Sequence, residues 1–87
     1  MPAVHRQTDA TSCPSGPQTW STDVFANNLG IVRNTDIVLP GGECQGGIYI
    51  GLSTVYVNSL AIQVIGSGTS CGHVAVTGSP DIFAELL

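Results

Sequence analysis

The residues of this chain best suited to chemistry are its three cysteines and two histidines. Cys13, Cys44 and Cys71 are separated by 31 and 27 positions, and the tripeptide Thr-Ser-Cys ends at the first and at the third of them. Three cysteines cannot all pair within one chain, so metal ligation and buried free thiols are the hypotheses to weigh. The spacing alone leaves both open, because thiolates bind metals and free cysteine is also among the most buried residue types.

One histidine stands close to a cysteine. His73 lies two positions after Cys71, where the other two cysteine loops carry Ser15 and Gly46. A Cys-x-His pair can place a thiolate and an imidazole on one side of a turn, so His73 is a candidate metal ligand. His5 lies away from the cysteine loops, and we interpret it as a solvated or interface residue and as the weaker candidate.

The elements that must position these residues recur at the cysteine spacing. In each copy a β-branched residue followed by an aromatic residue begins 11 positions after the cysteine. The three copies are Val24-Phe25-Ala26, Val55-Tyr56-Val57 and Ile82-Phe83-Ala84. A second pattern, Arg-x-Thr-Asp, occurs at residues 6–9 and 33–36. We therefore predict a single domain, residues 1–87, of three internal repeats, in which the N-terminal strand completes the third repeat.

The local patterns favour short β-strands. Stretches such as "GIYIG", "TVYVN" and "HVAVTG" alternate with a period of two, and no window shows a helical apolar stripe. Asn27-Asn28 and Asn58-Ser59 are predicted turns, because asparagine tolerates the positive φ of hairpin tips. The fold class is predicted to be all-β. A lone indole more often packs into a core than binds a partner, so we expect Trp20 in the core.

The composition argues against several classes of function. Charged residues make up 9% of the chain, and only Arg6 and Arg33 are basic, against roughly 25% charged residues in ordinary soluble domains. With a net charge of −4, a phosphate-tracking basic patch is excluded, and we expect no nucleic-acid partner. No nucleophile motif surrounds either histidine, so we expect neither an enzyme nor a small-molecule substrate. No apolar leader precedes the repeats, and we expect synthesis in the cytoplasm without a signal peptide.

The three repeats resemble the PAAR-repeat family, whose members form the small tips of contractile phage tails and type VI secretion systems. "GSPDIF" (residues 78–83) is similar to the family's Gly-Ser-Pro-x-Val-Phe element, and "GLSTVY" (residues 51–56) matches it loosely. The tetrads "AVHR", "GIVR" and "AIQV" stand at the Pro-Ala-Ala-Arg positions and keep two of three arginines. Thr8 and Thr35 replace the usual glycine, and Trp20 stands where this alignment places Gly51 and Gly78.

The resemblance implies a conical, pseudo-threefold fold whose cysteine loops converge near the tip. Such convergence favours a metal over inert thiols, and the ligand set would be Cys13, Cys44, Cys71 and His73, with His5 as the alternative fourth ligand. Three thiolates and an imidazole favour a structural zinc ion, with iron as the second choice. This set departs from the family, whose members more often combine several histidines with one cysteine.

The resemblance also implies a function and a partner. The chain would be a membrane-piercing structural tip that caps a trimeric β-helical spike, one monomer per trimer, and touches the target cell envelope transiently. It would be located at the spike tip of a virion tail baseplate or of a secretion apparatus. The alternative is a small zinc-stabilised module that binds a protein or a glycan. A metalloenzyme with an open ligand position is a third hypothesis, which we rank last.

Overall fold

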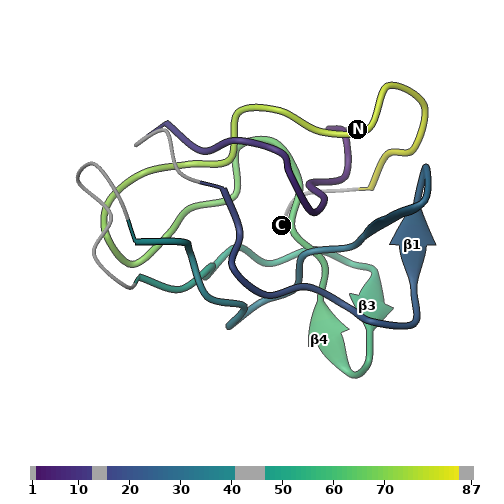
Figure 1. Cartoon of the computed structure of the whole chain (residues 1–87), viewed down its shortest axis with the longest axis horizontal. Coiled ribbons are helices and arrows are strands. Elements are labelled where there is room, and N and C mark those ends of the chain that lie inside the picture. Colours follow the sequence, from purple (N-terminus) through teal and green to yellow (C-terminus); the bar gives the residue numbers. More distant parts are fainter. Residues whose placement is uncertain (1, 13–15, 41–46, 85–87) are drawn as a thin grey trace.

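The chain folds without helices in the part that the structure describes. The computed structural model describes residues 2–12, 16–40 and 47–84. Its strands are β1 (Phe25–Ala26), β2 (Leu29–Gly30), β3 (Tyr56–Val57) and β4 (Leu60–Ala61). They form two small antiparallel sheets, β1 with β2 and β3 with β4 (Figure 1). The all-β prediction is confirmed at this level.

Each sheet is a hairpin closed by a two-residue turn. Both central residues of each turn have positive φ, at 55° and 66° for Asn27 and Asn28 and at 54° and 67° for Asn58 and Ser59. This is the type I′ geometry, whose twist matches that of the flanking strands. Asparagine occupies this left-handed region more readily than most residues. The predicted turns at these two positions are confirmed.

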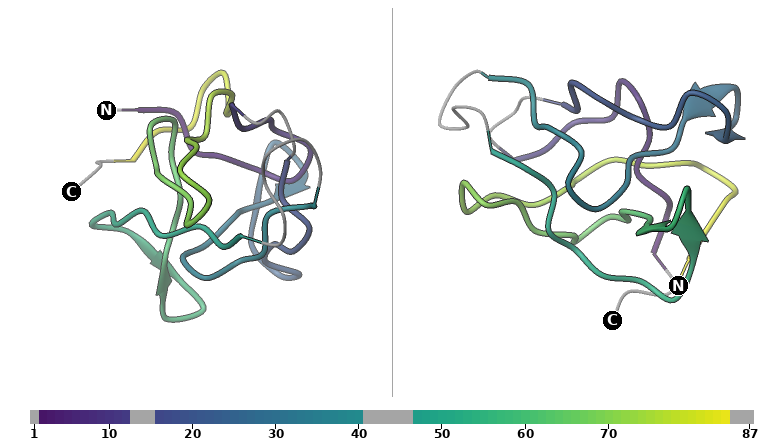
Figure 2. Two further views of the ribbon diagram at one scale, coloured as in Figure 1. Left: turned by 90° about the vertical axis from the view of Figure 1, so that its left-hand side faces the viewer. Right: turned by 90° about the horizontal axis from the view of Figure 1, so that it is seen from below.

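A third pairing of the same kind joins the two ends of the chain. Ala3 forms an antiparallel bridge with Phe83, and the N–H of Ala84 donates to the carbonyl of Pro2 at 3.0 Å. Phe25 pairs with Gly30 and Tyr56 with Ala61 in the same register. The N-terminal segment therefore lies beside the last one, as the purple and yellow segments of Figure 2 show.

At the centre, three segments are joined in a closed ring of backbone hydrogen bonds. His5 N–H donates to the Gln63 carbonyl (2.9 Å), Gln63 N–H to Val32 (2.9 Å), and Val32 N–H to His5 (3.2 Å). All three residues are fully buried. We call this feature the central ring. Because each segment gives one bond and receives one, the three segments occupy equivalent positions around it.

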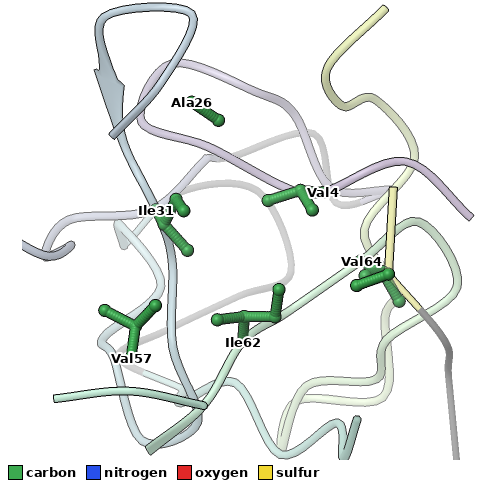
Figure 3. Packing of buried hydrophobic residues seen from close by; sticks show 7 residues of the cluster. Val4, Ala26, Ile31, Val57, Ile62 and Val64 are labelled. Atoms are coloured by element: carbon green, nitrogen blue, oxygen red, sulfur yellow. The ribbon is translucent and has the colours of Figure 1, made fainter. Parts of the chain in front are cut away.

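The hydrophobic core follows the same threefold order. The first cluster holds one β-branched residue before each central-ring position and one residue from each hairpin or end pairing (Figure 3). Its members are Val4, Ile31, Ile62, Ala26, Val57, Ala84 and Val64. A second cluster consists of Val32, Val38 and Tyr49, with Trp20 packed against it. Trp20 is partly buried and packs against the core, so the predicted packing role is confirmed.

The structure corrects one detail of the repeat alignment. A buried serine, Ser21, Ser53 or Ser79, accepts a hydrogen bond from the N–H two positions later in each segment. The residues before these serines are Trp20, Leu52 and Gly78, so Leu52, not Gly51, is the counterpart of Trp20. The middle segment is one residue shorter at this turn, which a comparison without gaps misplaces.

Candidate functional site

The predicted metal ligands are only partly within the described residues. Cys13 and Cys44 lie outside them, so the structure places only Cys71 and His73. These two residues flank Gly72, whose φ of 89° lets the chain turn sharply between them. Figure 1 shows the segment around residue 70 on the side of the molecule opposite the hairpins.

The bonds that Cys71 and His73 make decide whether these two predicted ligands can bind a metal ion. Cys71 is disulfide-bonded in this structure, and its Sγ lies 3.0 Å from the Thr69 hydroxyl. The Nδ1 of His73 shares a hydrogen bond of 2.9 Å with the Ser12 hydroxyl. Metal ligation requires a thiolate, so Cys71 could serve as a ligand only in the reduced chain. Among residues 2–12, 16–40 and 47–84, no three His, Cys, Asp or Glu side chains gather as a metal site.

His5 proves to be a buried core residue, so its interpretation as a solvated or interface residue is wrong. Its Nδ1 lies 2.8 Å from the Thr77 carbonyl and its Nε2 lies 2.9 Å from the Tyr49 hydroxyl. A carbonyl only accepts, so Nδ1 carries the proton and Nε2 accepts from Tyr49. Burial lowers the pKa of His5 and raises the pKa of Tyr49, which keeps both neutral. With both nitrogens engaged, His5 is no free metal ligand.

Two of the three segments carry an ion pair that closes the turn after the central ring. Arg6 Nε donates to Asp9 at 2.8 Å, and Arg33 pairs with Asp36 at 2.9 Å. Each aspartate also accepts the N–H of its arginine. Burial by itself would raise the pKa of Asp9, but the hydrogen bonds from Arg6 outweigh this effect and hold the pKa below its usual value.

The third segment replaces the ion pair with neutral groups. Val64 stands in the place of arginine, and the Ser67 hydroxyl accepts the Val64 N–H at 2.9 Å. Gly66, with φ of 95°, occupies the position of Thr8 and Thr35, whose φ values are 75° and 72°. The repeated Arg-x-Thr-Asp tetrads carried the signal for these ion pairs, because each places an arginine and an aspartate three residues apart.

Three aromatic side chains at equivalent positions of the two hairpins and the end pairing are exposed. Phe25, Tyr56 and Phe83 are 54%, 62% and 51% exposed. We call them the base triad. Each precedes a buried residue of the core, and each pairs in the same register with the segment beside it. Exposed aromatic side chains at three equivalent positions are candidate contacts for a partner.

The described residues form few other features that could serve as a site. No pocket opens among the described residues. No helix in these residues is long and apolar enough to cross a membrane. In comparisons with known proteins, no family model matches this chain, and no curated protein matches it either.

Proposed function

We propose that this chain is the tip of a contractile injection machine, where it caps the end of a trimeric β-helical spike. The observation that carries the proposal is the central ring, around which one chain repeats the same backbone pairing three times. A single chain with three equivalent segments can match the end of three identical chains, one segment for each. The resemblance to PAAR repeats supplies the class of partner.

The base triad is the surface that would meet the spike. Its aromatic side chains stand at equivalent positions on the hairpin end, and Val55 and Ile82 beside them are 42% and 37% exposed. Burying such side chains between two proteins supplies most of the association free energy. The backbone edges of the short strands offer further hydrogen bonds to a β-helix end.

The opposite end would be the piercing point. It carries Cys71 and His73, and in the reduced chain of a PAAR-like cone Cys13 and Cys44 would join them around a structural zinc ion. Such a metal would stabilise a point too narrow for a hydrophobic core, because its binding free energy becomes folding free energy. The action would be mechanical: the tip would concentrate the force of contraction on a cell envelope.

Binding to a purified spike tests the proposal. The trimeric β-helical spike from the same genome should form a complex with one copy of this chain per trimer, measured by native mass spectrometry. Tyr56→Ser should weaken this complex about tenfold or more, as expected for an aromatic side chain buried in an interface. Ile50→Ser is the matched control and should bind normally, because Ile50 is also an exposed apolar residue (50% exposed) but does not belong to the base triad. Absence of a complex would refute the proposal.

A further inference from the structure

Two carboxylates stand beside the base triad. Asp23 and Asp81 each lie two residues before a triad aromatic and two residues after a buried serine. Both side chains are exposed. The described residues contain two ion pairs, Arg6 with Asp9 and Arg33 with Asp36, so neither Asp23 nor Asp81 is neutralised by direct pairing. We call Asp23 and Asp81 the rim carboxylates.

Each rim carboxylate is held in place through one oxygen. Asn58 Nδ2 donates to Oδ1 of Asp23 at 3.1 Å, and Asn27 Nδ2 donates to Oδ1 of Asp81 at 2.8 Å. The hydroxyls of the buried serines Ser21 and Ser79 lie 2.9 and 3.1 Å from the same two oxygens. Each hydroxyl has one proton, which it shares between the carboxylate and the amide oxygen of the neighbouring asparagine. The Oδ2 atom of each carboxylate accepts no hydrogen bond from the described residues and remains available to a partner.

The orientation of the two asparagines is fixed by what lies on either side of them. The amide oxygen of Asn27 accepts from Arg6, and that of Asn58 accepts from Arg33, both at 3.1 Å. A guanidinium only donates and a carboxylate only accepts, so each amide has one possible orientation. The hydrogen bonds from the asparagines, and to a lesser extent those from the serines, lower the pKa of both rim carboxylates, which keeps them ionised.

The charge on this end of the molecule is therefore negative and fixed in position. Both arginines of the chain are engaged by Asp9 and Asp36. The middle segment has no rim carboxylate, because Ser53-Thr54-Val55 is one residue shorter than Ser21-Thr22-Asp23-Val24. Two of three equivalent positions thus present an anchored anion beside an exposed aromatic residue.

We infer that the end of the trimeric partner presents one lysine or arginine per subunit beside the surface that receives the base triad. Two of these three cations pair with Asp23 and Asp81, and the third faces the shorter middle segment. The inference rests on the proposed function and adds the chemistry of the partner surface. An interface between opposite charges at fixed positions sets the rotational register and speeds association.

Isosteric neutral variants test the inference against the same purified spike. Asp23→Asn and Asp81→Asn keep an acceptor oxygen for the anchoring hydrogen bonds and remove the charge. At about 50 mM salt each should raise the dissociation constant about threefold, as for a rim ion pair, and the double variant about tenfold. At about 1 M salt the differences should vanish, because screening removes the charge contribution. Calorimetric titration measures both conditions.

A variant with the same change in net charge at another site serves as the control. Gln18→Lys changes the net charge by the same amount at an exposed position on the segment paired with Ile37, and it should leave affinity within about twofold. Thermal unfolding of all variants should stay close to that of the parent. If the parent binds the trimer and both Asn variants bind equally well at low salt, the inference is wrong and the proposed function stands. Equal weakening by Gln18→Lys would also overturn it, and a parent that does not bind would overturn both.

Discussion

At the scale of single residues, the central ring shows how one position can hold three different side chains. Val32 needs no polar partner. Gln63 uses both ends of its amide on Gly51, accepting its N–H and donating to its carbonyl, each at 2.9 Å. His5 bonds Thr77 and Tyr49. No buried side-chain N or O atom of the described residues lacks a partner, which makes polar residues tolerable at this depth.

The burial of His5 predicts acid-sensitive stability. The folded pKa of His5 is lowered from 6.5, chiefly by burial, so the unfolded chain takes up the proton first as the pH falls. The free energy of unfolding should therefore decrease below about pH 6.5. His5→Gln, which copies Gln63, should remove this part of the pH dependence. Urea unfolding between pH 5 and 8 measures it, and an unchanged slope in the variant would contradict the assignment.

Thr8 and Thr35 illustrate what a residue pattern can and cannot predict. Both adopt positive φ, where a β-branched residue is strained by about 1–2 kcal/mol. The PAAR repeats that the sequence resembles have glycine at these positions, and glycine takes a positive φ without this strain. The compensation was not visible in the sequence, since it comes from aspartate side chains that bond the arginine backbone and side chain together.

At the scale of elements, the turns that follow the central ring differ in chemistry but share one geometry. In all three, the N–H of the fourth residue donates to the carbonyl of the first, at 2.9, 3.0 and 2.9 Å. Two of these turns add an Arg–Asp ion pair, and Thr77 and Thr19 donate to its carboxylates. The third turn uses Val64 and Ser67. The backbone geometry is therefore compatible with either side-chain pair.

The neutral pair of the third segment, Val64 and Ser67, should also be tolerated in the second segment. Arg33→Val leaves Asp36, which is only 5% exposed, without its cation and should cost about 3 kcal/mol of unfolding free energy. Adding Asp36→Ser to give the Val–Ser pair of the third segment should restore stability to within about 1 kcal/mol of the parent. A double-mutant cycle by urea unfolding measures the coupling. Additive effects of the two changes would refute the pairing.

The elements also show how far the sequence alone could lead. Alternation and Asn-rich tips predicted short strands and both hairpin turns, because these depend on local conformational preference. The predicted counterpart of Trp20 and the predicted exposure of His5 were wrong. Both depend on contacts between distant segments, such as His5 with Tyr49 and Thr77, which no local pattern encodes. The ligand residues Cys13 and Cys44 lie outside the described residues, so their grouping stays a prediction.

At the scale of the whole molecule, the described residues form a body of 28 × 24 × 24 Å with two chemically different ends. The hairpin end presents the base triad and the rim carboxylates. The segment around residues 71–73 lies at the other end. Because the first and last described segments pair with each other, the two halves of the third repeat are held in place by contacts between residues far apart in sequence. An 87-residue chain buries a limited apolar surface, so a covalent or metal constraint at one end would contribute substantially to stability.

The disulfide of Cys71 and the proposed zinc site are alternative constraints on that end. Zinc should therefore stabilise the reduced chain but not the oxidised chain. In the reduced chain, zinc at about a thousandfold excess over its dissociation constant should raise the free energy of unfolding by about 4 kcal/mol. The oxidised chain should gain little, because the sulfur of a disulfide is no thiolate ligand. His73→Gln should weaken zinc binding and Cys71→Ser should abolish the gain, while Ser70→Ala serves as the neighbouring control. Calorimetric unfolding with and without reductant and zinc measures all four chains, and equal zinc stabilisation of the oxidised and reduced chains would rule out the thiolate site.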